Sequence, residues 1–241
     1  MIAARRAIEE MSAAVCGYLR RDPENPPFQS ITDLLVLERS IRAKLHMAEH
    51  NATLLSSASL EQLDGVEDPL SDRPRPVTLI SDDDWEITIR SPMAAALIRY
   101  MAFSGAVSAC VNASDTMGRY LRVAYEIDDL PMRAASLKAV CSRLLAPSAL
   151  HTVLSASPGL EWMEKLRDLR GECQHGKLAG SHYRYAERSS EPLVPSLYCE
   201  DGNEVTMSAY LGWAIAKTDE LITKSARVIA ADPEHGVPLK A

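Results

Sequence analysis

The residues of this 241-residue chain with the clearest chemical potential lie between Gly159 and Gly176. Four apolar residues recur there at helical spacing and form one seam of a predicted helix: Trp162, Leu166, Leu169 and Cys173. At about 100° per residue, Arg170 lies about 70° to one side of this seam and His175 about 150° to the other. A guanidinium can hold a phosphate through two parallel hydrogen bonds, and an imidazole exchanges protons near neutral pH. The segment therefore offers an anion clamp and a proton-transfer group outside the core.

The motif Arg170-Gly-Glu-Cys-Gln-His175 resembles that of the HEPN superfamily, an Arg followed after four to six residues by a His. Its context is similar as well, because a Trp-x3-Leu-x2-Leu-Arg run precedes the His and Gly176 follows it. The resemblance covers about residues 91–231, and the N-terminal helices would complete the bundle. Gly171 stands where the family commonly has Asn.

The resemblance implies an all-α bundle that forms a homodimer, with the two motifs meeting at the interface. It implies an endoribonuclease that needs no metal or other cofactor and leaves a 2′,3′-cyclic phosphate, in a defence or toxin–antitoxin system with a protein partner. Arg170 and His175 would be the catalytic residues. The substrate-binding residues would be Arg167, Gln174, Lys177, Tyr183 and Arg184. A catalytically silent module that binds RNA, nucleotide or a protein partner is the alternative.

A third hypothesis comes from His46-Met-Ala-Glu-His50, which matches the H-x-x-E-H pattern of some zinc peptidases. Histidines four residues apart share one face of a helix, as two zinc ligands must, and Glu49 would act as general base. A further acid such as Glu126 would have to supply the third ligand. This reading predicts a zinc-dependent hydrolase through His46, Glu49 and His50.

Helical periodicity dominates the rest of the chain, which we interpret as a single domain over residues 1–241. The pattern predicts helices over 3–20, from Ser30 to about residue 55, from Pro92 to about Glu126, over 131–145, after Pro147, from Ser157-Pro158, and from Thr206 to Ala231. Two β-hairpins are also predicted. The first has strands 77–80 and 85–89, and the second, within 182–200, has strands 182–187 and 193–199. The predicted fold is mainly all-α, an up-and-down bundle of about five to six helices.

The net charge of −7 comes from residues 61–86, where nine acids face two bases. We interpret residues 58–90 as an acidic insertion that contains the first hairpin. The remaining charge is balanced, which argues against a protein-wide nucleic-acid surface and leaves room for a local basic groove.

The five cysteines are widely spaced and form no C-x-x-C pair, which favours reduced, mostly buried thiols in the cytoplasm. The first ten residues include two acids where an export signal needs an apolar run. The most apolar stretch, Met93 to Ala113, is interrupted by polar residues and is predicted to be a buried helix, with no membrane partner. Phosphate-loop, dinucleotide and serine-hydrolase motifs do not occur.

Overall fold

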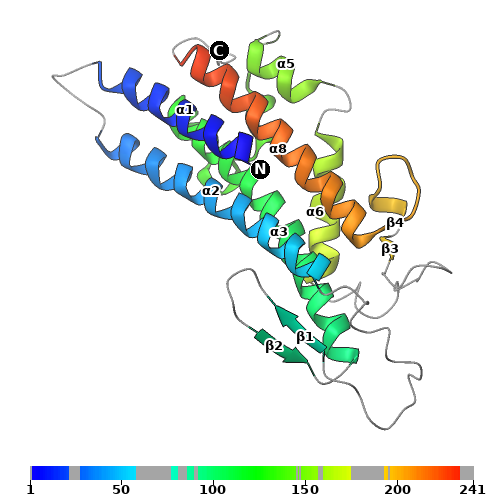
Figure 1. Cartoon of the computed structure of the whole chain (residues 1–241). Coiled ribbons are helices and arrows are strands. Elements are labelled where there is room, and N and C mark those ends of the chain that lie inside the picture. Colours follow the sequence, from blue (N-terminus) through cyan, green and yellow to red (C-terminus); the bar gives the residue numbers. More distant parts are fainter. Residues whose placement is uncertain are drawn as a thin grey trace. The chain divides into compact units, whose positions relative to one another are not determined.

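The computed structural model describes residues 2–21, 28–57, 77–80, 86–89, 92–144, 146, 148–156, 160–174, 193–194 and 196–233. Most of these residues are helical, which confirms the mainly α-helical fold (Figure 1). The α-helices are α1 (Ile2–Leu19), α2 (Phe28–Ser57), α3 (Pro92–Ala124), α4 (Leu137–Cys141), α5 (Ala149–Ser155), α6 (Glu161–Gln174) and α8 (Met207–Ala231). Two short 3-10 helices, η2 (Met132–Ala134) and η3 (Ser196–Tyr198), lie between them. None of the described helices is long and apolar enough to cross a membrane.

Side-chain oxygens fix several helix starts. Thr206 Oγ1 accepts the backbone N–H of Ala209 (3.2 Å), which caps the first turn of α8 where the sequence places it. The predicted start of the second helix at Ser30 is wrong, because α2 already begins at Phe28. Within the first turns of α2, the Asp33 carboxylate accepts a hydrogen bond from the side-chain amide of Gln29 (2.8 Å).

The prediction of one continuous helix over 131–145 is wrong. The segment divides into η2 and the five-residue α4. Ser136 between them has extended backbone angles (φ −103°, ψ 163°), and its hydroxyl accepts the N–H of Ala139. A residue in this conformation ends one helix and caps the next, so the chain restarts at Leu137.

The first hairpin is confirmed. Strands β1 (Val77–Ile80) and β2 (Glu86–Ile89) are antiparallel, with Val77 opposite Ile89.

The second hairpin differs from the prediction. β3 (Leu193–Val194) pairs with β4 (Val205–Thr206), and the expected strand up to Cys199 is replaced by η3. Gly202, at φ +76°, lies in the turn between them, a conformation that glycine adopts without strain. The expected strand 182–187 lies outside the described residues.

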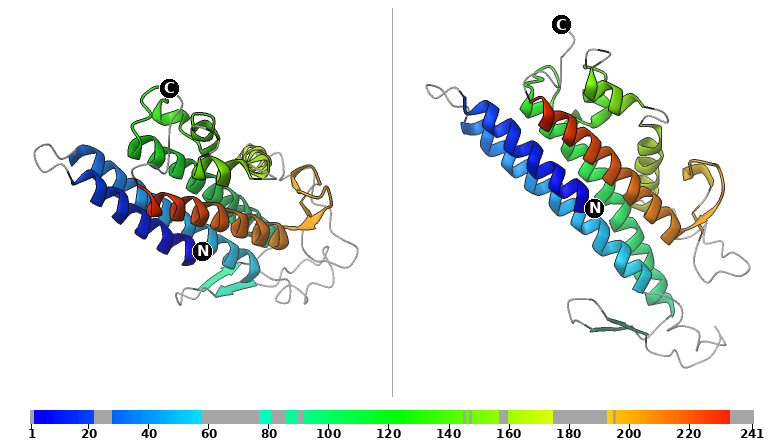
Figure 2. Two further views of the ribbon diagram at one scale, coloured as in Figure 1. Left: turned by 90° about the horizontal axis from the view of Figure 1, so that it is seen from above. Right: turned by 45° about the horizontal axis from the view of Figure 1, so that its top comes forward.

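The chain forms two compact units, and we describe each by itself. The first comprises residues 1–46, 109–164 and 214–241. In it α1, α2 and α3 alternate in direction, as predicted for an up-and-down bundle, whereas α8 runs parallel to α3 (Figure 2). A polar contact joins α2 to α3, because Lys44 Nζ donates to Thr116 Oγ1 (2.6 Å). Arg42 joins α2 to α1 through an ion pair with Glu9 (2.8 Å).

The second unit comprises residues 47–108 and 165–213. It contains most of α6, the first part of α3, the start of α8 and both hairpins. The rings of Phe103 on α3 and Tyr210 on α8 lie 6.2 Å apart and pack in its core. This unit carries the last turns of α6, where the motif lies.

Candidate functional site

The apolar seam of α6 fixes which way the helix faces. The four seam residues are buried, as the spacing predicts: Trp162, Leu166, Leu169 and Cys173. Met163 beside them is buried as well. A helix anchored along one seam cannot rotate about its axis, so its flanking polar residues hold fixed directions.

Arg167 and Arg170 lie on one flank of α6. Both side chains are partly buried, and the Nε atom of Arg170 is fully buried. An arginine at the edge of a core packs its aliphatic stem on apolar neighbours and keeps the guanidinium head near the surface. Gln174, the last residue of α6, is exposed. The two arginines therefore form a basic flank that leads to the end of the helix.

The opposite flank of α6 is acidic. Asp168 and Glu172 lie one turn apart, and both lie close enough to the Tyr198 phenol to act on its ionisation. Burial raises the pKa of Tyr198, and the nearby charges of Glu172 and Asp168 raise it further. The arginine flank carries no acid of α6, whereas the opposite flank carries Lys165 together with its two carboxylates, so the arginine flank suits a phosphate better.

Tyr100 on α3 holds the end of α6. Its hydroxyl donates to the backbone carbonyl of Cys173 (2.5 Å), one of the last four carbonyls of α6 that have no partner within the helix. Four residues further along α3, Ser104 lies close enough to the Cys173 thiol to lower its pKa, an effect that burial outweighs. Both contacts fix the backbone just before position 175. No sequence signal pointed to Tyr100 or Ser104, because tertiary partners leave no periodic pattern.

Tyr100→Phe is expected to lower the free energy of unfolding by about 1 kcal/mol, because the Cys173 carbonyl loses a partly buried donor. The ring keeps its packing, so the effect isolates the hydroxyl. Urea unfolding measures it, and amide hydrogen exchange of residues 170–174 should speed up selectively. Tyr18→Phe on α1 is the control. Equal exchange at the end of α6 in Tyr100→Phe and the wild-type chain would contradict the assignment.

Four of the predicted site residues lie outside the described part of the chain: His175, Lys177, Tyr183 and Arg184. The structure therefore places Arg167, Arg170 and Gln174 on α6. His175 is located only by its sequence position, directly after Gln174.

The H-x-x-E-H segment lies on α2, where His46 is exposed and Glu49 and His50 are partly buried. No group of three or more His, Cys, Asp and Glu side chains within the described ranges could hold a metal ion. Glu126, considered as the third ligand, is exposed in the turn after α3. Nothing in the described geometry favours the zinc hypothesis.

The thiols are mostly buried, as predicted. Cys16, Cys110, Cys173 and Cys199 are buried, and Cys141 on α4 is partly exposed. Burial raises the pKa of Cys110 and of Cys173 to about 12. A protonated thiol is a poor nucleophile, so Cys173 in the middle of the motif acts as a core residue.

Comparison of the chain with models of known protein families, with curated proteins and with solved structures found no match. The structure shows a mainly α-helical protein. Its helix α6 is anchored by a buried apolar seam, and Arg167 and Arg170 form a basic flank beside that seam. The likeness to the HEPN superfamily thus depends on the motif and its setting at a helix end.

Proposed function

We propose that the chain is a metal-independent endoribonuclease whose active site includes the C-terminal end of α6. One observation carries the proposal: Arg170 lies at the edge of the core on the last turns of α6, a helix anchored by its seam and held at its end by Tyr100. A charged side chain held in a fixed direction suits transition-state stabilisation, because no reorganisation is needed during the reaction. His175 directly follows the last residue of α6.

In the proposed reaction the 2′-hydroxyl of RNA attacks the adjacent phosphate. His175 takes the proton of this hydroxyl and then gives it to the leaving 5′-oxygen. The bond from phosphorus to that oxygen breaks, and a 2′,3′-cyclic phosphate remains. Arg170 binds the non-bridging oxygens and offsets their growing negative charge. Arg167 and Gln174 contact the neighbouring backbone.

The angle between the two residues supports a homodimer as the active form. If the helix continued to residue 175, Arg170 and His175 would point about 140° apart, too far to grip one phosphate from one chain. Two facing copies of α6 would bring the arginine of one chain to the imidazole of the other. The natural setting of such an enzyme is the cytoplasm, with RNA as substrate and a defence or antitoxin protein as partner.

The direct test is incubation of labelled single-stranded and transfer RNA with the purified protein in EDTA. We expect the wild-type chain to cleave and to leave cyclic phosphate ends. His175→Ala should lower the rate at least about a hundredfold, because it removes the proton-transfer group. His151→Ala on α5 is the matched control and should keep full activity. Cleavage that stops in EDTA, or that survives His175→Ala, would reject the proposal.

Gly171 is the reason to keep the silent binding module as a second candidate. The chain lacks the amide that commonly follows the arginine in the HEPN superfamily. The structure shows that the position can accept it, since a Cβ built on Gly171 meets nothing within 4 Å. A silent module would leave RNA intact in EDTA and shift its mobility on a gel.

Gly171→Asn is expected to raise the cleavage rate, because it adds an amide beside Arg170 without a steric clash. The same change should stabilise the helix by a few tenths of a kcal/mol, roughly the difference in helix propensity between the two residues. Gly212→Asn on α8, also in open space, is the control for stability and should leave cleavage unchanged. A rate that falls in Gly171→Asn would show that glycine itself is needed there.

A further inference from the structure

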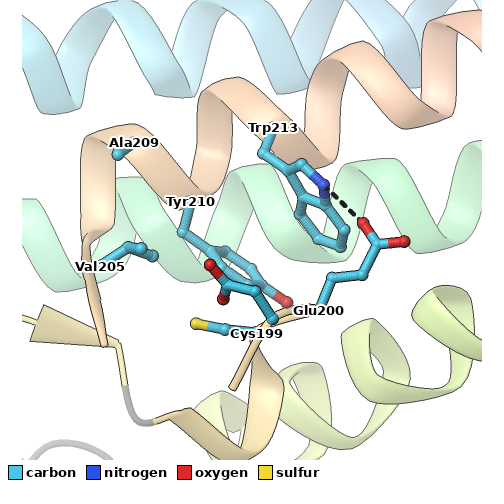
Figure 3. Close-up of a pocket in the computed structure, with 7 residues that line it drawn as sticks. Cys199, Glu200, Val205, Ala209, Tyr210 and Trp213 are labelled. Atoms are coloured by element: carbon cyan, nitrogen blue, oxygen red, sulfur yellow. Dashed lines mark hydrogen bonds between the residues drawn. The ribbon is translucent and has the colours of Figure 1, made fainter. Parts of the chain in front are cut away.

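A pocket of about 370 Å³ lies in the second unit (Figure 3). The residues that line it follow the arginine flank of α6 in the sequence and do not include it. Residues 199–201 and Val205 form one wall, and the first two turns of α8 form the other. Pockets of this volume are at the small end of the range for small-molecule sites. Neither the motif nor the proposed nuclease reaction uses it.

Two aromatic rings from α8 line the pocket. The centroids of Tyr210 and Trp213 lie 5.3 Å apart, with their planes tilted by 46°. The Tyr210 hydroxyl donates to the carbonyl of Tyr198 (3.1 Å), and Phe103 packs against the same ring. Tyr210 is therefore locked, and Trp213, only partly buried, offers ring surface toward the cavity. The aromatic wall is preformed.

Carboxylates provide the charge of the pocket. Glu200 Oε2 accepts the indole N–H of Trp213 (3.2 Å), which holds this carboxylate beside the ring (Figure 3). The Asp201 carboxylate accepts the backbone N–H (3.0 Å) and the side-chain amide (3.1 Å) of Asn203. These bonds hold the pKa of Asp201 below its ordinary value, so it is ionised at neutral pH.

No lysine, arginine or histidine is among the described residues that line the pocket. Lys165 on α6 lies against this loop, where its ammonium group donates to the Cys199 carbonyl (3.0 Å). Glu204 adds a third acid to the loop. Residues 199–205 thus contain three acids and no Lys, Arg or His, and this negative charge disfavours phosphate and nucleic acid here.

We propose that this pocket binds a small organic cation, a free amine or quaternary ammonium, with its charged nitrogen against the Trp213 ring and neutralised by Glu200 and Asp201. Aromatic faces attract cations through their negative quadrupole, and two nearby carboxylates add to that attraction. A volume of about 370 Å³ is large enough to enclose a small free cation completely. This proposal is independent of the nuclease function.

Choline is the probe, and the indole N–H resonance of Trp213 in a heteronuclear NMR spectrum is the readout. The chain has three tryptophans, and Trp213→Phe assigns the resonance because one indole signal disappears. We expect choline to shift this signal in a saturable way. The neutral isostere of choline, in which a tert-butyl group replaces trimethylammonium, should bind at least several-fold more weakly.

Glu200→Gln tests the charge without altering the shape, because the glutamine oxygen can still accept the Trp213 indole N–H. We expect choline affinity to fall roughly fivefold, because the site loses one ion pair of the strength usual at a protein surface. Glu220→Gln, on a later turn of α8 and outside the pocket lining, should leave the affinity unchanged. This control also accounts for the change in net charge.

Three results would overturn the proposal: no shift of the Trp213 signal with choline, equal binding of the neutral isostere, or equal affinity in Glu200→Gln. A short lysine-containing peptide tests whether the bound ammonium group belongs to a free molecule or to a lysine side chain. Binding of choline, with or without the peptide, supports a site for a free cation. Binding of the peptide alone rejects it.

Discussion

Gly118→Ala is expected to lower the free energy of unfolding by about 1–3 kcal/mol, the usual cost of overpacking a core. Gly118 is buried on α3, and the backbone of residues 135–137 packs directly on it. A Cβ there would lie 2.5 Å from the carbonyl carbon of Ser136 and 2.8 Å from the carbonyl oxygen of Ala135. Both neighbours are backbone atoms, so no side-chain rotation can relieve the clash.

The same substitution at Gly212 is the matched control. Gly212 is exposed on α8, and a Cβ there meets nothing within 4 Å. Gly212→Ala should therefore stabilise the chain by up to about 1 kcal/mol, the gain in helix propensity. Urea unfolding of both variants measures the difference. A Gly118→Ala variant as stable as the wild-type chain would show that the segment between α3 and α4 does not pack as described.

Arg170→Ala is expected to reduce RNA cleavage at least about a hundredfold, if the proposed nuclease function holds, because it removes charge stabilisation from the transition state. Arg170→Lys should show an intermediate loss, since an ammonium group keeps the charge and lacks the planar fork that binds two phosphate oxygens. Initial rates with a labelled single-stranded RNA measure both. Arg39→Ala, an exposed arginine on α2, is the control and should cleave normally.

Mixing the two inactive variants tests whether the site is shared between chains. A heterodimer of Arg170→Ala with His175→Ala contains one site in which both residues are intact, provided that each site takes one residue from each chain. Cleavage should therefore return to a sizeable fraction of the wild-type rate after subunit exchange. If each chain carries a complete site, the mixture stays inactive.

The long helices and the α6 seam could be predicted because they leave a periodic signal in the sequence. The seam residue Leu166 is buried as its spacing predicts. The break at Ser136 was not predicted, because a capping serine inside an otherwise helical pattern is a weak local signal. The segment around it also packs against Gly118 on α3. The partner of β3 was missed as well, since two-residue strands carry too little alternation to identify a pairing.

The candidate site was predictable only in part. Periodicity placed Arg170 beside the core, and the structure agrees. The contact that holds the end of α6 comes from Tyr100, 73 residues away in sequence, and no local pattern indicates it. The aromatic pocket was also missed. Its cavity arises when the loop from Cys199 to Val205 packs beside α8, and no local pattern around Trp213 indicates this packing.

The burial of the thiols has a practical consequence for measuring the assembly of this protein. Four of the five cysteines are buried, and Cys141 on α4 is the one that is partly exposed. A maleimide dye should therefore attach to the native chain mainly at a single position, with no need to remove the other cysteines. The efficiency of energy transfer between donor-labelled and acceptor-labelled chains would then report in real time how two protomers pair and exchange.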